Sequence, residues 1–252
     1  MTPVSVSGLS VSRNGRAVLQ DISLTVGGGE LVGLVGANGA GKTTLMRAML
    51  GLLPHRGQSS LSALPPQARA RQVAWMPQAR DIAWPVTVDT LVALGRTPHL
   101  GPLERASDAD RAAVDRAIAR QGLDAFRQRP ATELSGGEQA RALIARALAQ
   151  ETPVLMADEP IAGLDPAHQI STMRVFADLA AEGRAVIVSL HDLGLAVRHC
   201  TRLVVLDGGR IVADGPPLDV LTAERLGQSF SITAHVAQTP QGPVFQPLEV
   251  LG

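Results

Sequence analysis

The chain has 252 residues, 45% of them apolar and 18% charged, the composition of a globular protein long enough for one or two domains. Its 23 Lys and Arg residues balance 23 Asp and Glu residues, so the charge gives no indication of a nucleic-acid partner. The only cysteine, Cys200, excludes an internal disulfide and a cysteine-based metal site. It fits a reducing compartment, with the thiol as a small buried apolar residue.

The first 18 residues, MTPVSVSGLSVSRNGRAV, lack a basic stretch followed by an apolar core, so we expect no secretory signal. Uninterrupted apolar runs all fall short of the roughly 18–20 residues that span a bilayer. If the protein serves a membrane process, other chains must therefore supply the membrane-spanning part.

Apolar alternation predicts short antiparallel strands over Val4–Val26, with turns at Asn14-Gly15 and at residues 27–29. The next segment, Leu31–Val35, is a continuous apolar run, which is typical of a buried parallel strand. A glycine-rich turn follows, and a helix is expected to begin near Lys42.

Helical spacing of apolar residues marks the middle of the chain, over residues 108–121 and again from Ser135 onward. A strand pattern returns at Val154–Ala157, Ala185–Leu190, Leu203–Leu206 and Ile211–Ala213. We therefore expect one α/β domain over residues 1–252, with an antiparallel β subdomain and an inserted α-helical subdomain at about residues 79–150. The sequence Gly215-Pro216-Pro217 predicts the start of a short C-terminal extension, about residues 215–252.

The segment GANGAGKTT matches the phosphate-binding pattern G-x-x-x-x-G-K-[ST] between a predicted strand and a predicted helix. Backbone N–H groups of the turn and of the helix N-terminus can surround phosphate oxygens. Lys42 can reach the β- and γ-phosphates, and the Thr43 hydroxyl can bind Mg²⁺. A chance glycine-rich turn is the alternative, but the context favours a nucleoside triphosphate site. Its residues are Gly36, Ala37, Asn38, Gly39, Ala40, Gly41, Lys42, Thr43 and Thr44.

An apolar strand, VLMADE, ends in the two acids Asp158 and Glu159. Asp158 would hold Mg²⁺ through water, and Glu159 would polarise the water that attacks the γ-phosphate. Alone, such a pair is more often a solvated strand end. Because a phosphate-binding loop precedes it, the catalytic interpretation is favoured.

The segment LSGGE contains Ser135, Gly136, Gly137 and Glu138. Ser135 can cap the helix that follows, and the two glycines expose backbone N–H groups there. A plain capping box, in which Ser135 and Glu138 bond each other's backbone, explains those two residues equally well.

Six motifs in order resemble the ATPase subunits of ATP-binding cassette (ABC) transporters: GANGAGKTT, the glutamine of WMPQ, LSGGE, VLMADEP, the loop AGLD and the histidine of SLHD. The resemblance covers nearly the whole chain and implies a P-loop NTPase core. It also implies a head-to-tail dimer, in which ATP lies between one subunit's P-loop and the LSGGE segment of the second copy. There Ser135, Gly136 and Gly137 would bind the γ-phosphate.

The resemblance gives roles to three further residues. It implies that Gln78 contacts Mg²⁺ or the attacking water and links hydrolysis to the helical subdomain. It implies that Asp165 touches the opposite subunit and that His191 contacts the γ-phosphate. Taken alone, a histidine at a strand end is more often an ordinary hydrogen-bonded residue.

The chain departs from the family pattern at three places. Arg13 stands where relatives usually place an aromatic ring against adenine, and the chain has no tyrosine. A guanidinium can stack on a base, or Arg13 is a surface charge. The signature ends in Glu138 rather than the commoner glutamine, and Ile161-Ala162 replaces a frequent serine-alanine pair before Asp165.

Two softer stretches, VALGRTPH (residues 92–99) and GLDPAHQ (residues 163–169), resemble importer subunits that serve iron–siderophore, haem and cobalamin permeases. An ordinary helix ending at Gly95 is the alternative explanation for the first. The resemblance implies an ATP-hydrolysing subunit of a metal-chelate importer, peripheral to the cytoplasmic face of the inner membrane. An iron–siderophore is favoured as its cargo over cobalamin or haem. The subunit's partners would be integral-membrane permease subunits and, indirectly, an extracytoplasmic substrate-binding protein. An exporter subunit and a soluble, non-transport ABC ATPase remain the alternatives.

Trp84 lies beside Pro85 and just before an expected helix start at Thr87. Some apolar residues of the surrounding segment, Ala79–Leu103, are expected to pack inside the helical subdomain; the candidates are Val86, Val88, Leu91 and Leu94. Aromatic residues are enriched at protein interfaces. We therefore expect Trp84 in or beside the groove that receives a cytoplasmic helix of the permease.

Overall fold

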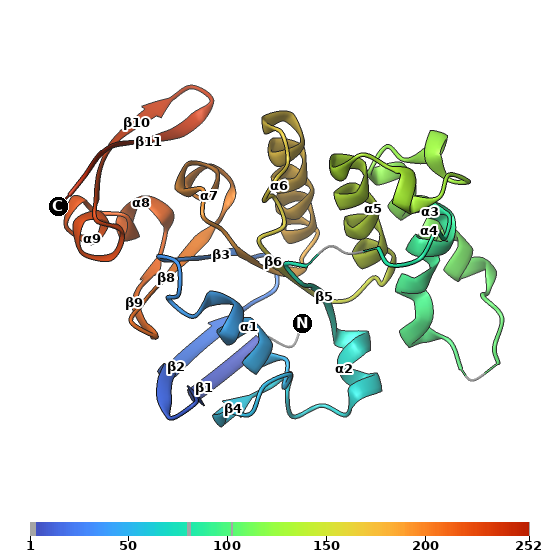
Figure 1. Cartoon of the computed structure of the whole chain (residues 1–252), viewed down its shortest axis with the longest axis horizontal. Helices are drawn as coiled ribbons and strands as arrows, with labels where there is room; N and C mark the ends of the chain where they lie inside the picture. The colour runs from blue at the N-terminus through green and yellow to red at the C-terminus, as the bar shows by residue number, and fades with distance from the viewer. Residues whose placement is uncertain (1–3, 80–81, 102, 252) are drawn as a thin grey trace. The chain divides into compact units, whose positions relative to one another are not determined.

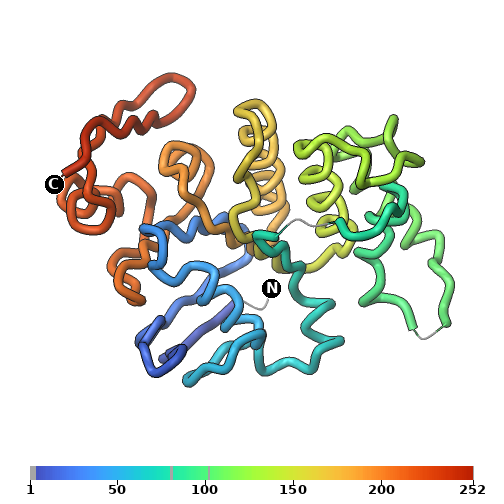
Figure 2. Tube along the Cα trace, viewed as in Figure 1, coloured from blue at the N-terminus to red at the C-terminus, as the bar shows by residue number. Residues whose placement is uncertain are grey.

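The computed structural model describes residues 4–79, 82–101 and 103–251, so part of the expected segment 79–103 lies outside the described residues. The chain forms two compact units. The first extends to Leu64 and resumes at Met173, and the second is Pro65–Thr172. Figure 1 labels the elements and Figure 2 traces the path of the chain.

An antiparallel sheet opens the first unit, in the order β2-β1-β4. Its strands are β1 (Val4–Arg13), β2 (Arg16–Val26) and β4 (Arg56–Ser59). The turn between β1 and β2 is Asn14-Gly15, and both residues have positive φ, 50° and 75°. Asn and Gly adopt that conformation readily, and it suits the twist of a hairpin. The expected hairpin over Val4–Val26 is confirmed.

Parallel strands follow in the same unit: β3 (Leu31–Val35) pairs with both β7 (Ala185–Ser189) and β8 (Arg202–Asp207). The last strand, β9 (Arg210–Gly215), joins β8 antiparallel. All five residues of β3 and all five of β7 are buried, as continuous apolar runs predict. Because β3 and β7 run in the same direction, their carboxyl ends meet at one edge.

Helices and a hairpin complete the first unit after Leu190. They are α7 (Leu193–His199), α8 (Pro217–Val220), α9 (Ala223–Phe230) and the two-stranded sheet of β10 (Ile232–Thr239) and β11 (Gly242–Val250). The sequence pattern predicted only a short extension here. The strands β10 and β11 carry few buried residues, so the alternation of apolar residues that marks a core strand is weak in their sequences.

The second unit contains one parallel strand pair, β5 (Val73–Met76) and β6 (Val154–Asp158), and most of the helices. The helices are α2 (Pro66–Gln72), α3 (Val88–Ala93), α4 (Asp108–Arg120), α5 (Gly136–Ala149) and the 3₁₀ turns η1 (Leu94–His99), η2 (Asp124–Phe126) and η3 (Ala131–Glu133). Helix α6 (Pro166–Ala181) begins in the second unit and ends in the first. The boundary between the units therefore falls inside α6.

The fold is mixed α/β with an antiparallel β part and a helical part, as expected. Val88 and Leu91 are buried as predicted, whereas Leu94 is 51% exposed because α3 ends at Ala93 and the chain tightens into a 3₁₀ turn. Among the described residues, no helix is both long enough and apolar enough to cross a membrane.

Candidate functional site

The predicted site residues fall into two groups, one in each compact unit. In the first unit, β3 leads through residues 36–41 into α1 (Lys42–Met49). Three glycines of this loop, Gly36, Gly39 and Gly41, have positive φ of 151°, 82° and 105°. A Cβ on Gly36 would lie 2.2 Å from the Leu206 carbonyl oxygen, so only glycine fits between the loop and β8.

The Lys42 side chain is buried and lies against the loop that precedes it. Its Nζ donates to the carbonyl oxygens of Gly36 at 2.7 Å and Ala37 at 3.2 Å. These bonds hold a positive charge at the centre of the loop, beside the N-terminus of α1. Thr43 and Thr44, both half-buried, occupy the first turn of that helix. The positive end of the helix dipole and the ammonium make this loop a candidate site for an anion of phosphate type.

A cavity of about 470 Å³ adjoins this helix start. Its lining includes Arg13 and Val18 from the β1–β2 hairpin and Thr43, Thr44 and Arg47 from α1. Arg13 is exposed, so its guanidinium is accessible at the rim. The sequence pattern placed Arg13 near the nucleotide base but gave no role to Val18 or Arg47, which carry no motif.

His191 lies two residues beyond the end of β7. The Leu190 backbone N–H donates to the Leu34 carbonyl oxygen at 3.0 Å, so the two strands β7 and β3 stay paired up to their carboxyl ends. His191 thus leaves the sheet at the same edge as the phosphate-binding loop. The next residue, Asp192, caps α7 by accepting from the Leu195 N–H at 2.8 Å.

In the second unit, the parallel pairing of β5 and β6 brings Gln78 to Glu159. Met76 on β5 is paired with Ala157 on β6. Gln78 and Glu159 each lie two residues beyond that pair, and the Gln78 Nε2 donates to Glu159 Oε2 at 2.9 Å. Asp158 ends β6 and is 1% exposed. Glu159 has a positive φ of 49°, a strained backbone conformation for a residue other than glycine.

Ser135 and Glu138 form a complete capping box at the start of α5. The Ser135 N–H and hydroxyl both donate to Glu138 Oε2 at 2.8 Å, and the Glu138 N–H donates back to the Ser135 Oγ at 3.4 Å. These bonds lower the pKa of the Glu138 carboxyl, the backbone bond contributing most. The helix start is therefore rigid, with Gly136 exposed beside it.

Asp165 lies at the start of α6 and is exposed. Its carboxylate accepts from the His168 backbone N–H at 3.0 Å and contacts the His168 Nδ1 at 2.6 Å. These bonds lower the Asp165 pKa. A Cβ on Gly137 would lie 3.7 Å from the same Nδ1, so Asp165 and the LSGGE segment are neighbours. The sequence pattern included His168 in a family stretch but gave it no role.

The residues that the sequence predicts as metal ligands carry oxygen donors, which suit a hard cation such as Mg²⁺. Among the described residues, no group of three or more His, Cys, Asp and Glu side chains could hold a metal ion. Mg²⁺ typically binds through one or two carboxylates plus substrate phosphates and water. The Thr43 hydroxyl and the Asp158 carboxylate are oxygen ligands of the required kind.

Comparisons with known proteins agree with this geometry. The family model described as "ABC transporter" matches residues 19–162. Among similar proteins, the cobalamin import ATP-binding protein BtuD of Halobacterium salinarum is 44% identical over 244 residues, which cover 94% of this chain and 61% of the relative. The hemin import ATP-binding protein HmuV of Nocardia farcinica is 42% identical, covering 92% of this chain and 84% of the relative.

A solved structure of an inward-facing ABC transporter, described as of the metal-chelate type, superposes with a TM-score of 0.86 at 25% identity and covers 98% of both chains. The chain spans 61% of the length of the halobacterial relative, so that relative contains a further part with no counterpart here.

Proposed function

Because this chain belongs to the ABC transporter family and forms its ATP-binding domain, we propose that it binds and hydrolyses ATP to power a membrane importer. The observation that carries the ATPase assignment is the phosphate-binding loop, in which Lys42 and three positive-φ glycines surround the start of α1. The relatives named for cobalamin and hemin import support the importer assignment.

Phosphoryl transfer to water needs positioning and charge stabilisation more than covalent chemistry. In the proposed site, Lys42 and the N–H groups of the loop bind the β- and γ-phosphates. Glu159 accepts a proton from the attacking water, and Gln78 holds that carboxylate in place through its 2.9 Å hydrogen bond. Thr43, Gln78 and Asp158 would hold Mg²⁺, which neutralises phosphate charge when bound. His191 would contact the γ-phosphate.

A second copy of the chain completes the site in the proposed head-to-tail dimer. Ser135, Gly136 and Gly137 supply N–H groups from a helix N-terminus to the γ-phosphate of the opposite subunit, with Glu138 fixing the turn. Asp165, beside that turn, would contact the opposite subunit. The capping box supports this role because a rigid helix start needs little reordering when it meets the phosphate.

We further propose that the importer carries a metal chelate, with an iron–siderophore favoured over haem or cobalamin. The protein would sit peripherally on the cytoplasmic face of the inner membrane, against permease subunits, with an extracytoplasmic substrate-binding protein as an indirect partner.

The exposure of Trp84 supports a docking surface for the permease, because this residue of the second unit is 74% exposed. Replacing Trp84 with Ala should lower cargo uptake per ATP in the reconstituted complex, while ATP binding by the isolated subunit stays unchanged.

Two variants test the nucleotide site. Lys42→Ala removes the charge on the β/γ-phosphates and should abolish ATP turnover with the fold intact. Glu159→Gln keeps the shape and removes the base, so ATP should stay bound between two subunits and produce a dimer on sizing with ATP and Mg²⁺. Normal turnover in the lysine variant would contradict the site. A Glu159→Gln variant that hydrolyses ATP at the wild-type rate would contradict the proposed base.

A further inference from the structure

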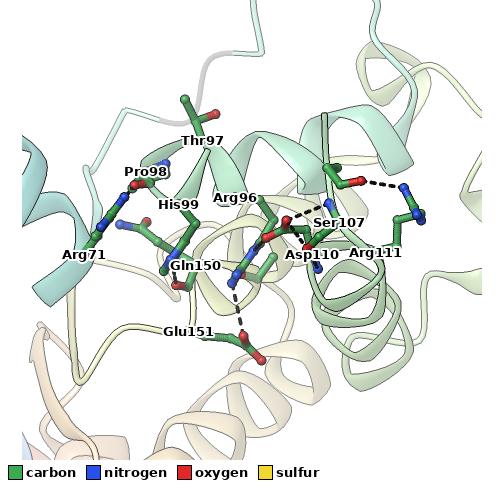
Figure 3. Close-up of polar contacts among 12 residues, drawn as sticks. Arg71, Arg96, Thr97, Pro98, His99, Ser107, Asp110, Arg111, Gln150 and Glu151 are labelled. Atoms are coloured by element: carbon green, nitrogen blue, oxygen red, sulfur yellow. Dashed lines mark hydrogen bonds and ion pairs between the residues drawn. The ribbon is translucent and has the colours of Figure 1, made fainter. Parts of the chain in front are cut away.

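The nucleotide site leaves unexplained the segment Gly95–His99, which the sequence pattern singled out within VALGRTPH. In the structure this segment lies in the 3₁₀ turn η1 (Leu94–His99), which directly follows helix α3. Arg96 is only 8% exposed despite its charge. Figure 3 shows its side chain among α4, the C-terminal end of α5 and the residues that follow that end.

The Arg96 guanidinium joins three parts of the second unit. Its Nε donates to Asp110 Oδ1 on α4 at 2.8 Å. Its Nη1 donates to the carbonyl oxygen of Ala149, the last residue of α5, at 2.8 Å and to Glu151 Oε2 at 3.1 Å. A cation at a helix C-terminus also complements the negative end of the helix dipole.

Neighbouring residues hold the same end of α5. The His99 Nε2 donates to the Gln150 carbonyl oxygen at 2.8 Å, since a carbonyl can only accept. The Gln150 side chain in turn donates to the carbonyl oxygen of Ala70, on α2, at 2.5 Å. A Cβ on Gly95 would lie 2.2 Å from the Arg146 carbonyl oxygen, so the two backbones are in direct contact.

Along the chain, this end of α5 lies between the LSGGE segment and the two carboxylates Asp158 and Glu159. Helix α5 has 14 residues, and its first turn carries the LSGGE segment. At 1.5 Å per residue, that turn is about 21 Å from the held end. Only the four residues 150–153 separate α5 from β6, which ends at Asp158. A tilt at the held end would displace the first turn relative to Glu159.

We propose that Arg96 is a positioning residue for ATP hydrolysis: it fixes the C-terminal end of α5 and thereby the placement of the LSGGE segment relative to β6. This inference rests on the proposed function, in which LSGGE binds the nucleotide of the second copy. Arg96 touches no nucleotide itself.

A buried ion pair is a poor source of stability, because desolvating two charges offsets most of their attraction. Removing one partner alone is costly, since it leaves the other charge buried and unpaired. A positioning role and a purely stabilising role therefore separate in a double variant. Arg96→Met together with Asp110→Asn removes the two buried charges, and Glu151 keeps its ion pair with Arg116. The amide introduced on α4 can still accept from the backbone and hydroxyl of Ser107 in the capping box.

The test is made in the full chain with three measurements: thermal unfolding, ADP affinity, and ATP-dependent dimerisation in a Glu159→Gln background. ADP reports the phosphate-binding loop alone, whereas dimerisation needs the LSGGE segment. In the double variant we expect wild-type-like unfolding and an ADP affinity within about twofold, but dimerisation weakened at least about tenfold. ATP turnover without the Glu159 change should fall to a similar extent.

The matched control is Arg111→Gln, because Arg111 also pairs with an aspartate on α4, whereas its partners among the described residues, Asp108 and Ala106, are not on α5. It should change none of the three measurements. A double variant with normal dimerisation and turnover would overturn the inference, as would an equal loss of ADP binding. If Glu159→Gln alone fails to dimerise with ATP, the proposed function itself is contradicted and the inference falls with it.

A second pair of variants avoids the buried charge. His99→Gln keeps a donor for the Gln150 carbonyl oxygen, and His99→Ala removes it. We expect dimerisation to weaken severalfold in the Ala variant and to stay normal in the Gln variant. Equal behaviour of the two variants would show that the bond does not position α5.

Discussion

Gly95 is the residue at which the close contact between η1 and α5 can be tested most directly. Its φ lies outside the positive range, so alanine can adopt this backbone conformation. In the unfolded chain, Gly→Ala reduces conformational freedom, and by itself it would stabilise the protein by about 0.4–1 kcal/mol. The outcome therefore depends on the space around the added methyl group.

That space is occupied by backbone. The added Cβ would lie 2.2 Å from the Arg146 carbonyl oxygen and 3.2 Å from the Ala149 Cβ. Neither atom can rotate away, so η1 and α5 must separate. Overpacking of this kind costs about 1–3 kcal/mol. After the gain from the unfolded state, we expect Gly95→Ala to lower the free energy of unfolding by about 1–2 kcal/mol, or about 2–8 °C in Tm at this chain length.

Urea denaturation followed by far-UV circular dichroism measures the change. Gly215→Ala is the control, because its added Cβ would lie 3.4 Å from the Val220 side chain, an ordinary contact. The control should match or slightly exceed wild-type stability. A Gly95→Ala variant as stable as wild type, beside a control that behaves as expected, would show that the two backbones separate without cost and would refute the reasoning.

Three further predictions concern charge and reactivity. Bonds from the Ser107 side chain and backbone, and then from Arg96, lower the pKa of Asp110 from 3.8 to about 2; its contribution to stability is therefore full above about pH 4 and lost as the pH falls toward 2. The difference in unfolding free energy between wild type and Asp110→Asn should shrink over that interval, and a constant difference would contradict the assignment. Burial raises the Cys200 pKa to about 12, so a thiol reagent at pH 8 should label it only in denaturant, at least about 100-fold faster than in the native protein. With Arg13 in place of an aromatic ring, GTP should compete with ATP within about tenfold, or 1.4 kcal/mol, and strong exclusion of GTP would show that the base contact is misplaced.

Much of the fold could be predicted from the sequence because its signals are local. Buried parallel strands are short apolar runs, and the hairpin turn carries Asn14-Gly15, so β1–β2, β3 and β6–β9 were all identifiable. The phosphate-binding loop is equally local, since Gly36, Gly39 and Gly41 each need a backbone conformation that other residues avoid. The nucleotide contacts assigned by resemblance remain predictions.

Contacts across long sequence separations were beyond the sequence pattern. Arg96 meets Ala149 and Glu151, more than 50 positions away, and nothing in GRTPH indicates those partners. The same holds for Gln150 and Ala70. The C-terminal hairpin was missed for a different reason: it buries little apolar surface, and Val250 is 82% exposed, so its alternation reports no core.

The placement of strained and buried groups in the second unit has a common physical basis. Glu159 adopts a positive φ, and Arg96 is buried with its charge. Each is costly in isolation, and each persists only where surrounding bonds fix it. Glu159 is fixed by Gln78 at the end of β5, and Arg96 by α4 and the end of α5. Glu159 directly follows β6, and Arg96 bonds Glu151, three residues before β6 begins. Under the proposed mechanism, β6 must hold the catalytic carboxylate in a fixed position relative to the first turn of α5. Selection for stability alone would favour residues that avoid the strained φ at position 159 and the buried charge at position 96. The presence of Glu159 and Arg96 beside β6 is what a requirement for precise geometry predicts.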